Sequence, residues 1–301
     1  MRIAARLALA AILMSCMDLA AIRVARGQEP QVLMPDESAA KAKQVLDRAI
    51  DALGGPAYLN VQDVTSNEQV SQFDHSGELT GYLDANDFRQ LPDKDRIEYI
   101  AKSHNTVLLF LAGAEGLEVA HGGVVITLYN GDRGWSYDRS GVNELPADSV
   151  SEFKESARES LDNILRHRIH EPGLILRYGG TDIVDLKEVD WVELVDSDDR
   201  TIRIAVSRST HLPVQRIIET LDPNTRLTTQ EIEDYSNYQP IQGIQTPFQV
   251  TRWRNKMKIY QAFFTSCAYN TNLADSLFTK QSLEDRWNQS DGKHQKKKDN
   301  N

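Results

Sequence analysis

The chain has 301 residues, with 44 Asp and Glu against 34 Lys and Arg, so its formal net charge is −10. A chain with this acidic excess repels phosphate backbones, which argues against nucleic-acid binding. The length suits one large β-rich domain or two small ones.

The first residues have the pattern of an export signal. Arg2 and Arg6 precede an apolar run over residues 7–17 that is too short to span a bilayer. No later segment is long and apolar enough for a transmembrane helix. The pattern therefore predicts an exported protein with no transmembrane span.

Two fates of this N-terminal segment fit the sequence. Small residues before Gln28 predict cleavage there, which makes residues 1–27 a signal peptide and places the protein in the periplasm. Alternatively, the lipobox-like residues 13–16 would make Cys16 a lipidated N-terminus that anchors the chain. Both remain open at this point.

Two segments have the apolar spacing of amphipathic helices. The first covers residues 37–53 and ends at the Gly54-Gly55-Pro56 breaker. The second is an insertion over about 148–168, whose start resembles a capping box. Both helices need an apolar surface against which to pack.

The rest of the chain alternates with the period of two that strands have. The predicted strands cover 64–73, 77–84, 95–102, 106–113, a hairpin at 123–138, 181–196, 200–208, 213–221, 226–238, 244–255 and 258–269. Their short turns force antiparallel neighbours, and so long a sheet must curl to bury one face. The predicted fold is mainly β with α: a strongly curved antiparallel sheet forming an incomplete barrel, lidded by helices.

The predicted strands also define the domain organisation. Residues 28–285 are predicted to form a single domain that contains all of the strands. Residues 286–301 are charged and lack an apolar face, so they are predicted to be a disordered polar tail.

No motif for chemistry is found. The sequence has no nucleophile elbow, zinc-protease motif or phosphate-binding loop, and we interpret His167 and His170 as a solvated helix end. Cys267 is interpreted as a small buried residue. We therefore predict no catalytic residue, no metal and no cofactor.

Large aromatic side chains are the remaining candidates for a site. They either fill the core or line an apolar cavity that the curled sheet leaves open. The tentative cavity or core residues are Trp135, Trp191, Phe248, Trp253 and Phe263.

Several short motifs, taken in order, resemble the LolA/LolB-like family of outer-membrane lipoprotein-sorting proteins. They are the Y-x-x-Y-Q-P-I-x-G-I-x-x-P run at 235–247, His211-Leu212-Pro213, the N-G-x-x-G-W hairpin at 130–135, the entry helix before Gly54, and the A-D-S-L-F close at 274–278. The resemblance spans most of residues 37–280. It implies a curved half-barrel, lidded by helices, with an apolar cavity for acyl chains.

This resemblance leads to a hypothesis of a non-enzymatic, exported carrier. Its partners would be a lipid or an acylated lipoprotein, together with an envelope protein that donates or accepts the cargo. The alternative is an interaction module in which side chains fill the barrel and the sheet binds an envelope protein. A hydrolase with an unrecognised site is a third hypothesis.

Overall fold

The computed structural model describes residues 33–74, 76–101, 117–119, 123–197, 200–221 and 226–298, with side chains as far as Gln289. The predicted signal peptide, Cys16 and the predicted strand at 106–113 lie outside these residues. Residues 1–36 form one unit and residues 37–301 form the compact unit described below.

Within the described residues, thirteen strands form one antiparallel sheet. They are β1 Asp63–Phe73, β2 Leu79–Gln90, β3 Lys94–Ile100, β4 Val124–Asn130, β5 Arg133–Asp138, β6 Gly141–Glu144, β7 Ile175–Val184, β8 Lys187–Val195, β9 Thr201–Ser207, β10 Pro213–Leu221, β11 Thr228–Ile241, β12 Ile244–Arg254 and β13 Met257–Tyr269. Pairing of β1 with β13 joins two meanders, in the order β6-β5-β4-β3-β2-β1-β13-β12-β11-β10-β9-β8-β7. Within the described residues β6 and β7 are free edges, so the sheet is open, and the predicted fold class is confirmed.

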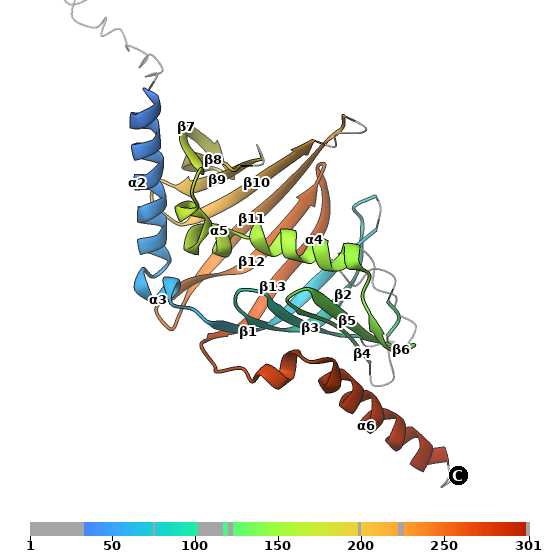
Figure 1. The fold of residues 1–301 in the computed structure, drawn as a ribbon. Helices are drawn as coiled ribbons and strands as arrows, with labels where there is room; N and C mark the ends of the chain where they lie inside the picture. Colours follow the sequence, from blue (N-terminus) through green and yellow to red (C-terminus); the bar gives the residue numbers. More distant parts are fainter. Residues whose placement is uncertain are drawn as a thin grey trace, which may run out of the picture. The chain divides into compact units, whose positions relative to one another are not determined.

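Helices interrupt or flank the two meanders (Figure 1). They are α2 Pro35–Leu53, α3 Pro56–Leu59, α4 Ala147–Arg158, α5 Leu161–Arg166 and α6 Lys280–Lys298, with 3-10 turns at Arg168–His170 and Asp275–Phe278. The predicted helix at 37–53 matches α2. It ends where Gly54 adopts φ +132°, and a Cβ there would lie 2.6 Å from the Gly243 carbonyl oxygen, so only glycine fits.

One face of the sheet, called the inner face here, is covered by α2, α3 and α5. The apolar stripe of α2, which includes Leu46 and Ile50, packs with Ile164 and Leu165 of α5. Below them lie Val192, Leu194, Ile202, Ile204 and Ile218 of β8–β10. Because side chains alternate across a strand, these positions identify the inner face of every neighbouring strand through the pairing register.

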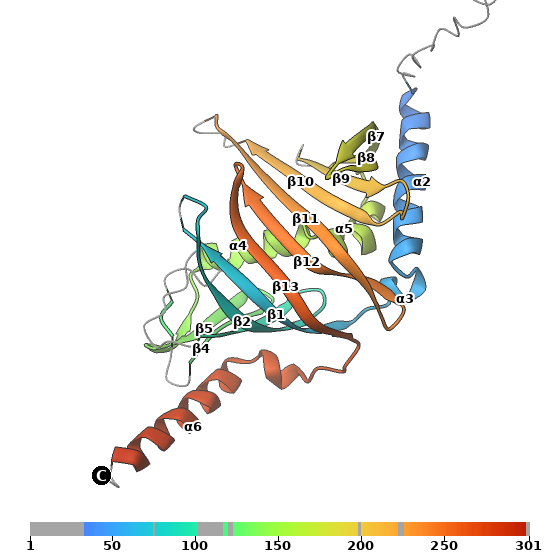
Figure 2. The same ribbon diagram turned by 180° about the vertical axis from the view of Figure 1, so that it is seen from behind.

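Helix α4 crosses the inner face and links two distant parts of the sheet. It lies in front of the sheet in Figure 1 and behind it in Figure 2. The rings of Phe153 on α4 and Tyr129 on β4 stack with centroids 4.0 Å apart. Further along α4, Glu155 forms an ion pair with Arg200, which directly precedes β9. Seven strands lie between β4 and β9 in the sheet, so α4 is a strap across the opening.

The opposite, outer face of β3–β5 is covered by α6. Leu283 is fully buried with Ile126 and Trp135, and Arg286 forms an ion pair of 3.0 Å with Glu98. The backbone of α6 is helical as far as Lys298, and the disorder of residues 286–301 stays a prediction. Its Lys and Gln residues are good helix formers, and the preceding turn is held by burial of Leu283.

Two elements differ from the sequence-based prediction. The inserted helix at about 148–168 is two helices, because Ser160 is extended and its Oγ accepts a hydrogen bond from the Asn163 amide at 3.2 Å, which starts α5. The predicted strand at 181–196 contains a hairpin turn. Asp185 and Leu186 both have positive φ there, which suits a two-residue hairpin.

Candidate functional site

A row of directly paired residues crosses the inner face and changes from apolar to charged. Ile204 on β9 pairs with Arg216 on β10, which pairs with Glu233 on β11. Glu233 in turn pairs with Arg252 on β12, which pairs with Tyr260 on β13. Strands β10–β12 thus present charges where β8 and β9 present isoleucine, leucine and valine.

The first part of this charged surface, here the arginine half, consists of Arg216, Glu233 and Arg252. Glu233 is buried and accepts from both arginines, with N–O distances of 3.1 and 2.9 Å. The Tyr235 hydroxyl donates a third bond at 2.6 Å. Burial alone would raise the pKa of Glu233, but the two guanidinium groups outweigh it and lower that pKa to about 2. Glu233 is therefore a fixed anion between two cations.

The second part, here the acidic half, lies on β1–β3 and consists of Glu68, Asp87, Arg89 and Asp95. Asp95 is directly opposite Arg89, and Asp87 is one inner-face position further along β2. Arg89 Nε lies 2.9 Å from Asp87 Oδ2. The two halves meet at Tyr260, whose hydroxyl is 3.3 Å from Glu68 Oε1. We call both halves together the polar band.

Burial perturbs the acids of this half strongly. It raises the pKa of Glu68 to about 8, with a further contribution from the negative charge of Asp87. It also raises the pKa of Asp95 well above its usual range, again helped by Asp87. The pKa of Asp87 is raised by burial too, although the Arg89 guanidinium opposes the shift. The carboxyl groups are thus poorly compensated as anions.

Parts of the polar band remain accessible. The side chain of Arg252 is 26% exposed and that of Arg89 is 37% exposed, while the acids beside them are buried. An apolar cluster adjoins the acidic half, with Val70, Leu83 and Ala85 among its members. No residue of a described helix belongs to that cluster. The inner face near β1 and β2 therefore combines partly exposed arginines with buried apolar side chains.

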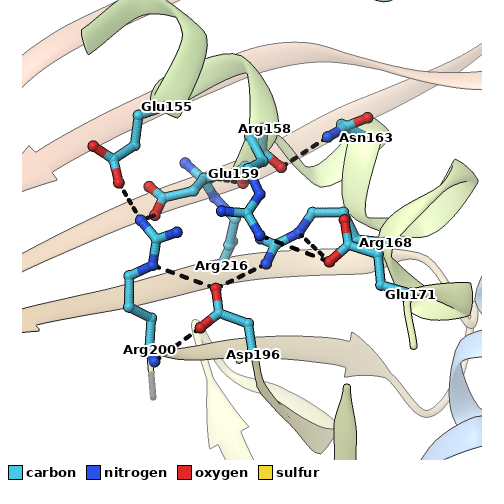
Figure 3. A network of polar contacts seen from close by, with 9 residues as sticks. All are labelled: Glu155, Arg158, Glu159, Asn163, Arg168, Glu171, Asp196, Arg200 and Arg216. Atoms are coloured by element: carbon cyan, nitrogen blue, oxygen red, sulfur yellow. Dashed lines mark hydrogen bonds and ion pairs between the residues drawn. The ribbon is translucent and has the colours of Figure 1, made fainter. Parts of the chain in front are cut away.

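A network of ion pairs fixes α4 and α5 over the other end of the band (Figure 3). Arg200 contacts Asp196 at 3.3 Å and Glu159 at 3.3 Å, and Arg216 donates to the Glu159 carbonyl oxygen. The fully buried Arg168 also belongs to this network and lies 2.9 Å from Asp196. The strap is thus attached to the polar band itself, through Arg216.

The five predicted aromatic residues do not gather at one site. Phe248 shares the inner face with Val250 and Arg252 by strand alternation. The other four lie on the outer face: Trp135 packs against Leu283 of α6, Trp191 against Ala205 and Ile217, Trp253 donates to Asp234 at 2.7 Å, and Phe263 is 38% exposed. Trp135 and Trp191 are buried members of outer-face clusters.

The polar band was missed because its members are scattered over six strands. Acidic pairs are frequent in a chain with 44 acidic residues, so none stood out. A signal existed in β1, where Ser66 and Glu68 stand between Val64 and Val70 at the alternate positions that a buried face would fill with apolar residues. Reading each strand for charges on its buried face would have found it.

Two further observations limit the chemistry. No cluster of three or more His, Cys, Asp or Glu residues suited to a metal occurs in the part of the chain that the structure describes. Within those same residues, no helix is long and apolar enough to cross a membrane.

No protein-family model and no curated protein matches the sequence. Among solved structures, the chain is similar to a DUF1329 family protein from Desulfovibrio piger, with 15% identity, 80% of this chain and 98% of that chain covered, and a TM-score of 0.49. It is also similar to a LolA superfamily protein from Nitrosomonas europaea, with 15% identity, 80% and 99% covered, and a TM-score of 0.47. A third is a putative outer membrane lipoprotein-sorting protein domain from Vibrio parahaemolyticus, with 10% identity, 80% and 99% covered, and a TM-score of 0.48.

Proposed function

We propose that this protein is a non-enzymatic carrier of the cell envelope that holds a lipid, or the acyl chains of a lipoprotein, on its inner face. The observation that carries the proposal is the polar band. It lies beside apolar surface on a face spanned by the α4 strap, and Arg89 and Arg252 remain partly exposed within it. An amphiphile has the same two parts, a polar head and an apolar chain.

Energetics support a ligand more than a purely structural role. Buried ion pairs rarely stabilise a fold better than apolar residues of the same volume, because desolvation offsets the attraction. An acyl chain, in contrast, gains about 0.8 kcal/mol for each methylene removed from water. A face that carries both features is better explained by binding than by folding alone. Movement of α4 would admit the chain.

The proposed carrier would be exported and would exchange its cargo with other envelope proteins. The N-terminal pattern of Arg2, Arg6 and residues 7–17 supports delivery to the envelope, either as a soluble periplasmic protein or anchored through Cys16. The cargo would come from one envelope protein and pass to another.

A second candidate function rests on the outer face. A shallow groove of about 300 Å³ there is lined by Gln215, Ile232, Asp234, Trp253 and Lys256. Tryptophan beside charged residues is common at protein–protein contacts. This groove favours the alternative of an interaction module that binds an envelope protein.

Native mass spectrometry tests the carrier. The full chain is produced in a bacterial periplasm, purified without detergent, weighed intact, and then extracted for lipid. The carrier predicts a population heavier by the mass of a lipid or an acylated peptide. A single apo mass, together with failure to bind a fluorescent fatty acid, would overturn the proposal.

Adjacent residues of β12 offer a matched pair of variants. Arg252→Met changes the inner face and Trp253→Phe changes the outer groove. The carrier predicts that only Arg252→Met alters the amount or identity of the bound lipid. If Trp253→Phe had the larger effect, the interaction module would be favoured.

A further inference from the structure

The acidic half of the polar band carries more negative than positive groups. Glu68, Asp87 and Asp95 face one arginine, Arg89, and the only ion pair among them within the described residues is that of Arg89 with Asp87. Asp162 of α5 contributes a further negative charge near Arg89. Asp95 is 9% exposed and makes no ion pair or hydrogen bond to any described residue.

An independent observation concerns hydrogen bonds. Ser66 Oγ and Thr127 Oγ1 are buried on the same inner face and lack hydrogen-bond partners among the described residues, as do Asp87 Oδ1 and Asp95 Oδ1. Ser66 is directly opposite Asp87, and Thr127 is directly opposite Ile97, the next inner-face residue of β3 after Asp95. More than about 90% of buried polar groups in folded proteins are paired, so the atoms of Ser66, Asp87 and Asp95, which come from three adjacent strands, are open to a further partner.

We propose that Asp87 and Asp95, with the Ser66 hydroxyl beside Asp87 and the carboxyl group of Glu68 nearby, bind the ammonium group of an amphiphilic ligand. The inference rests on the proposed carrier function and names the chemical class of its cargo. An ammonium group has three donors and a positive charge, and both carboxylates and hydroxyls can accept from it. A buried cation here would offset the negative charge that Arg89 leaves uncompensated.

The surroundings support this assignment. Burial raises the pKa of Glu68 to about 8 and that of Asp95 well above its usual range. Without a bound cation these raised pKa values favour the protonated, neutral form of each acid. Other titratable or charged groups near these acids include Arg89, Arg252, Tyr99, Tyr129, Tyr260, Cys267 and Asp162. Val70, Leu83 and Ala85, all of them buried, lie next to Glu68 and give the site apolar neighbours.

The test compares ligands with one chain and different heads. Dodecylamine, dodecanoate and dodecyl maltoside are titrated into the full-length, delipidated protein at pH 7.5, followed by intrinsic tryptophan fluorescence and calorimetry. We expect dodecylamine to bind about ten- to hundredfold more tightly than dodecanoate, as charge-assisted hydrogen bonds imply. Ethanolamine, which has the ammonium group without the chain, should bind far more weakly than dodecylamine.

Variants locate the site. Asp95→Asn should bring dodecylamine binding to within about threefold of dodecyl maltoside. Asp93→Asn, two residues away on the exposed turn, should keep the full preference. Thermal unfolding of both variants checks that they are folded.

The outcomes separate the two proposals. If all three amphiphiles bind equally, or dodecanoate binds best, the ammonium site is wrong while the carrier function stands. If none binds, the carrier function itself fails. If ethanolamine binds as tightly as dodecylamine, the pocket serves a small amine and the amphiphile assignment is overturned.

Discussion

The inner face consists of an apolar half and a charged half, the polar band, although strands of the same geometry form both. Under α2 and α5, strands β8 and β9 present Val192, Leu194, Ile202 and Ile204, all fully buried. From β10 onward along the sheet, the polar band replaces them with arginines and carboxylates. One half has the composition of an ordinary core, and the other does not.

The difference between the two halves indicates which residues stabilise the fold and which belong to a binding surface. A buried charge is destabilising unless it is well paired, so a sequence that only had to fold would place apolar residues on both halves. Positions that break the pattern without an evident structural gain are expected at functional sites. The apolar half therefore holds the structure together, and the polar band is the surface to examine for binding.

The largest expected effect is at Glu233. Replacing it by leucine leaves Arg216 and Arg252 without their shared anion in a buried position. We expect Glu233→Leu to lower the free energy of unfolding by about 3–5 kcal/mol, measured by urea denaturation. The control is Glu231→Leu on the same strand and face, whose pair with Arg254 is exposed, and it should change stability by about 1 kcal/mol or less. Equal effects would show that the arginine half is not a coupled buried unit.

The apolar half should respond to loss of volume. Leu46 of α2 is 1% exposed within the inner-face core, so Leu46→Ala should cost about 2–5 kcal/mol of unfolding free energy. Leu186→Ala makes the same chemical change at a side chain that is 96% exposed, and it should stay within about 0.5 kcal/mol. A small effect at Leu46 would mean that α2 does not hold the inner face.

The acidic half should respond to pH in the opposite sense from an ordinary carboxylate. The folded pKa of Glu68 is raised from about 4.5 to about 8, so the stability from its protonated form is complete below pH 4.5 and is lost as pH rises to 8. Glu68→Gln should remove this loss and make the variant more stable than wild type at pH 8, by about 1 kcal/mol or more.

The matched control for this profile is Glu78→Gln at an exposed position after β1. It should reproduce the wild-type dependence of unfolding free energy on pH. A Glu68→Gln protein that is less stable than wild type at pH 8 would contradict the account, because it would mean that the ionised carboxylate stabilises the fold.

The smallest effect concerns the strap. Glu155 pairs with Arg200 at a partly exposed position, so Glu155→Gln should change global stability by about 0.5 kcal/mol or less. Its consequence should instead be local, as faster hydrogen exchange of the α4 amides without change in α2. Unchanged exchange in α4 would show that this ion pair does not hold the strap.

Much of the fold could be predicted because the strands and α2 have strong periodicity and short turns. The order of β10 to β13 and the hairpin at β4 and β5 follow from apolar alternation and from turns such as Asn130-Gly131. The break at Ser160 was harder to see, because the apolar spacing continues through it. Residues 286–298 have no apolar stripe, so their sequence does not indicate the helix that the backbone forms.

The candidate site could not be predicted in the same way. Its residues come together only through the pairing of β1 with β13, which joins segments about 200 positions apart, and sequence spacing does not reveal such a pairing. The aromatic residues were chosen for size, but size does not decide on which face of a strand a residue lies. Trp253 and Arg252 are neighbours in sequence and lie on opposite faces.

The central claim is that ligand covers the polar band on the inner face, and Cys267 can test it. This half-buried thiol is directly opposite Ser66 on that face. We would compare its alkylation rate by iodoacetamide in the protein as purified and after delipidation, with mass spectrometry to locate the label. A cysteine at Gln249, on the outer face opposite Phe263, is the control in a Cys267→Ser background. The account predicts that delipidation accelerates labelling of Cys267 several-fold and leaves the control unchanged, whereas equal rates at Cys267 before and after removal of a bound lipid would contradict it.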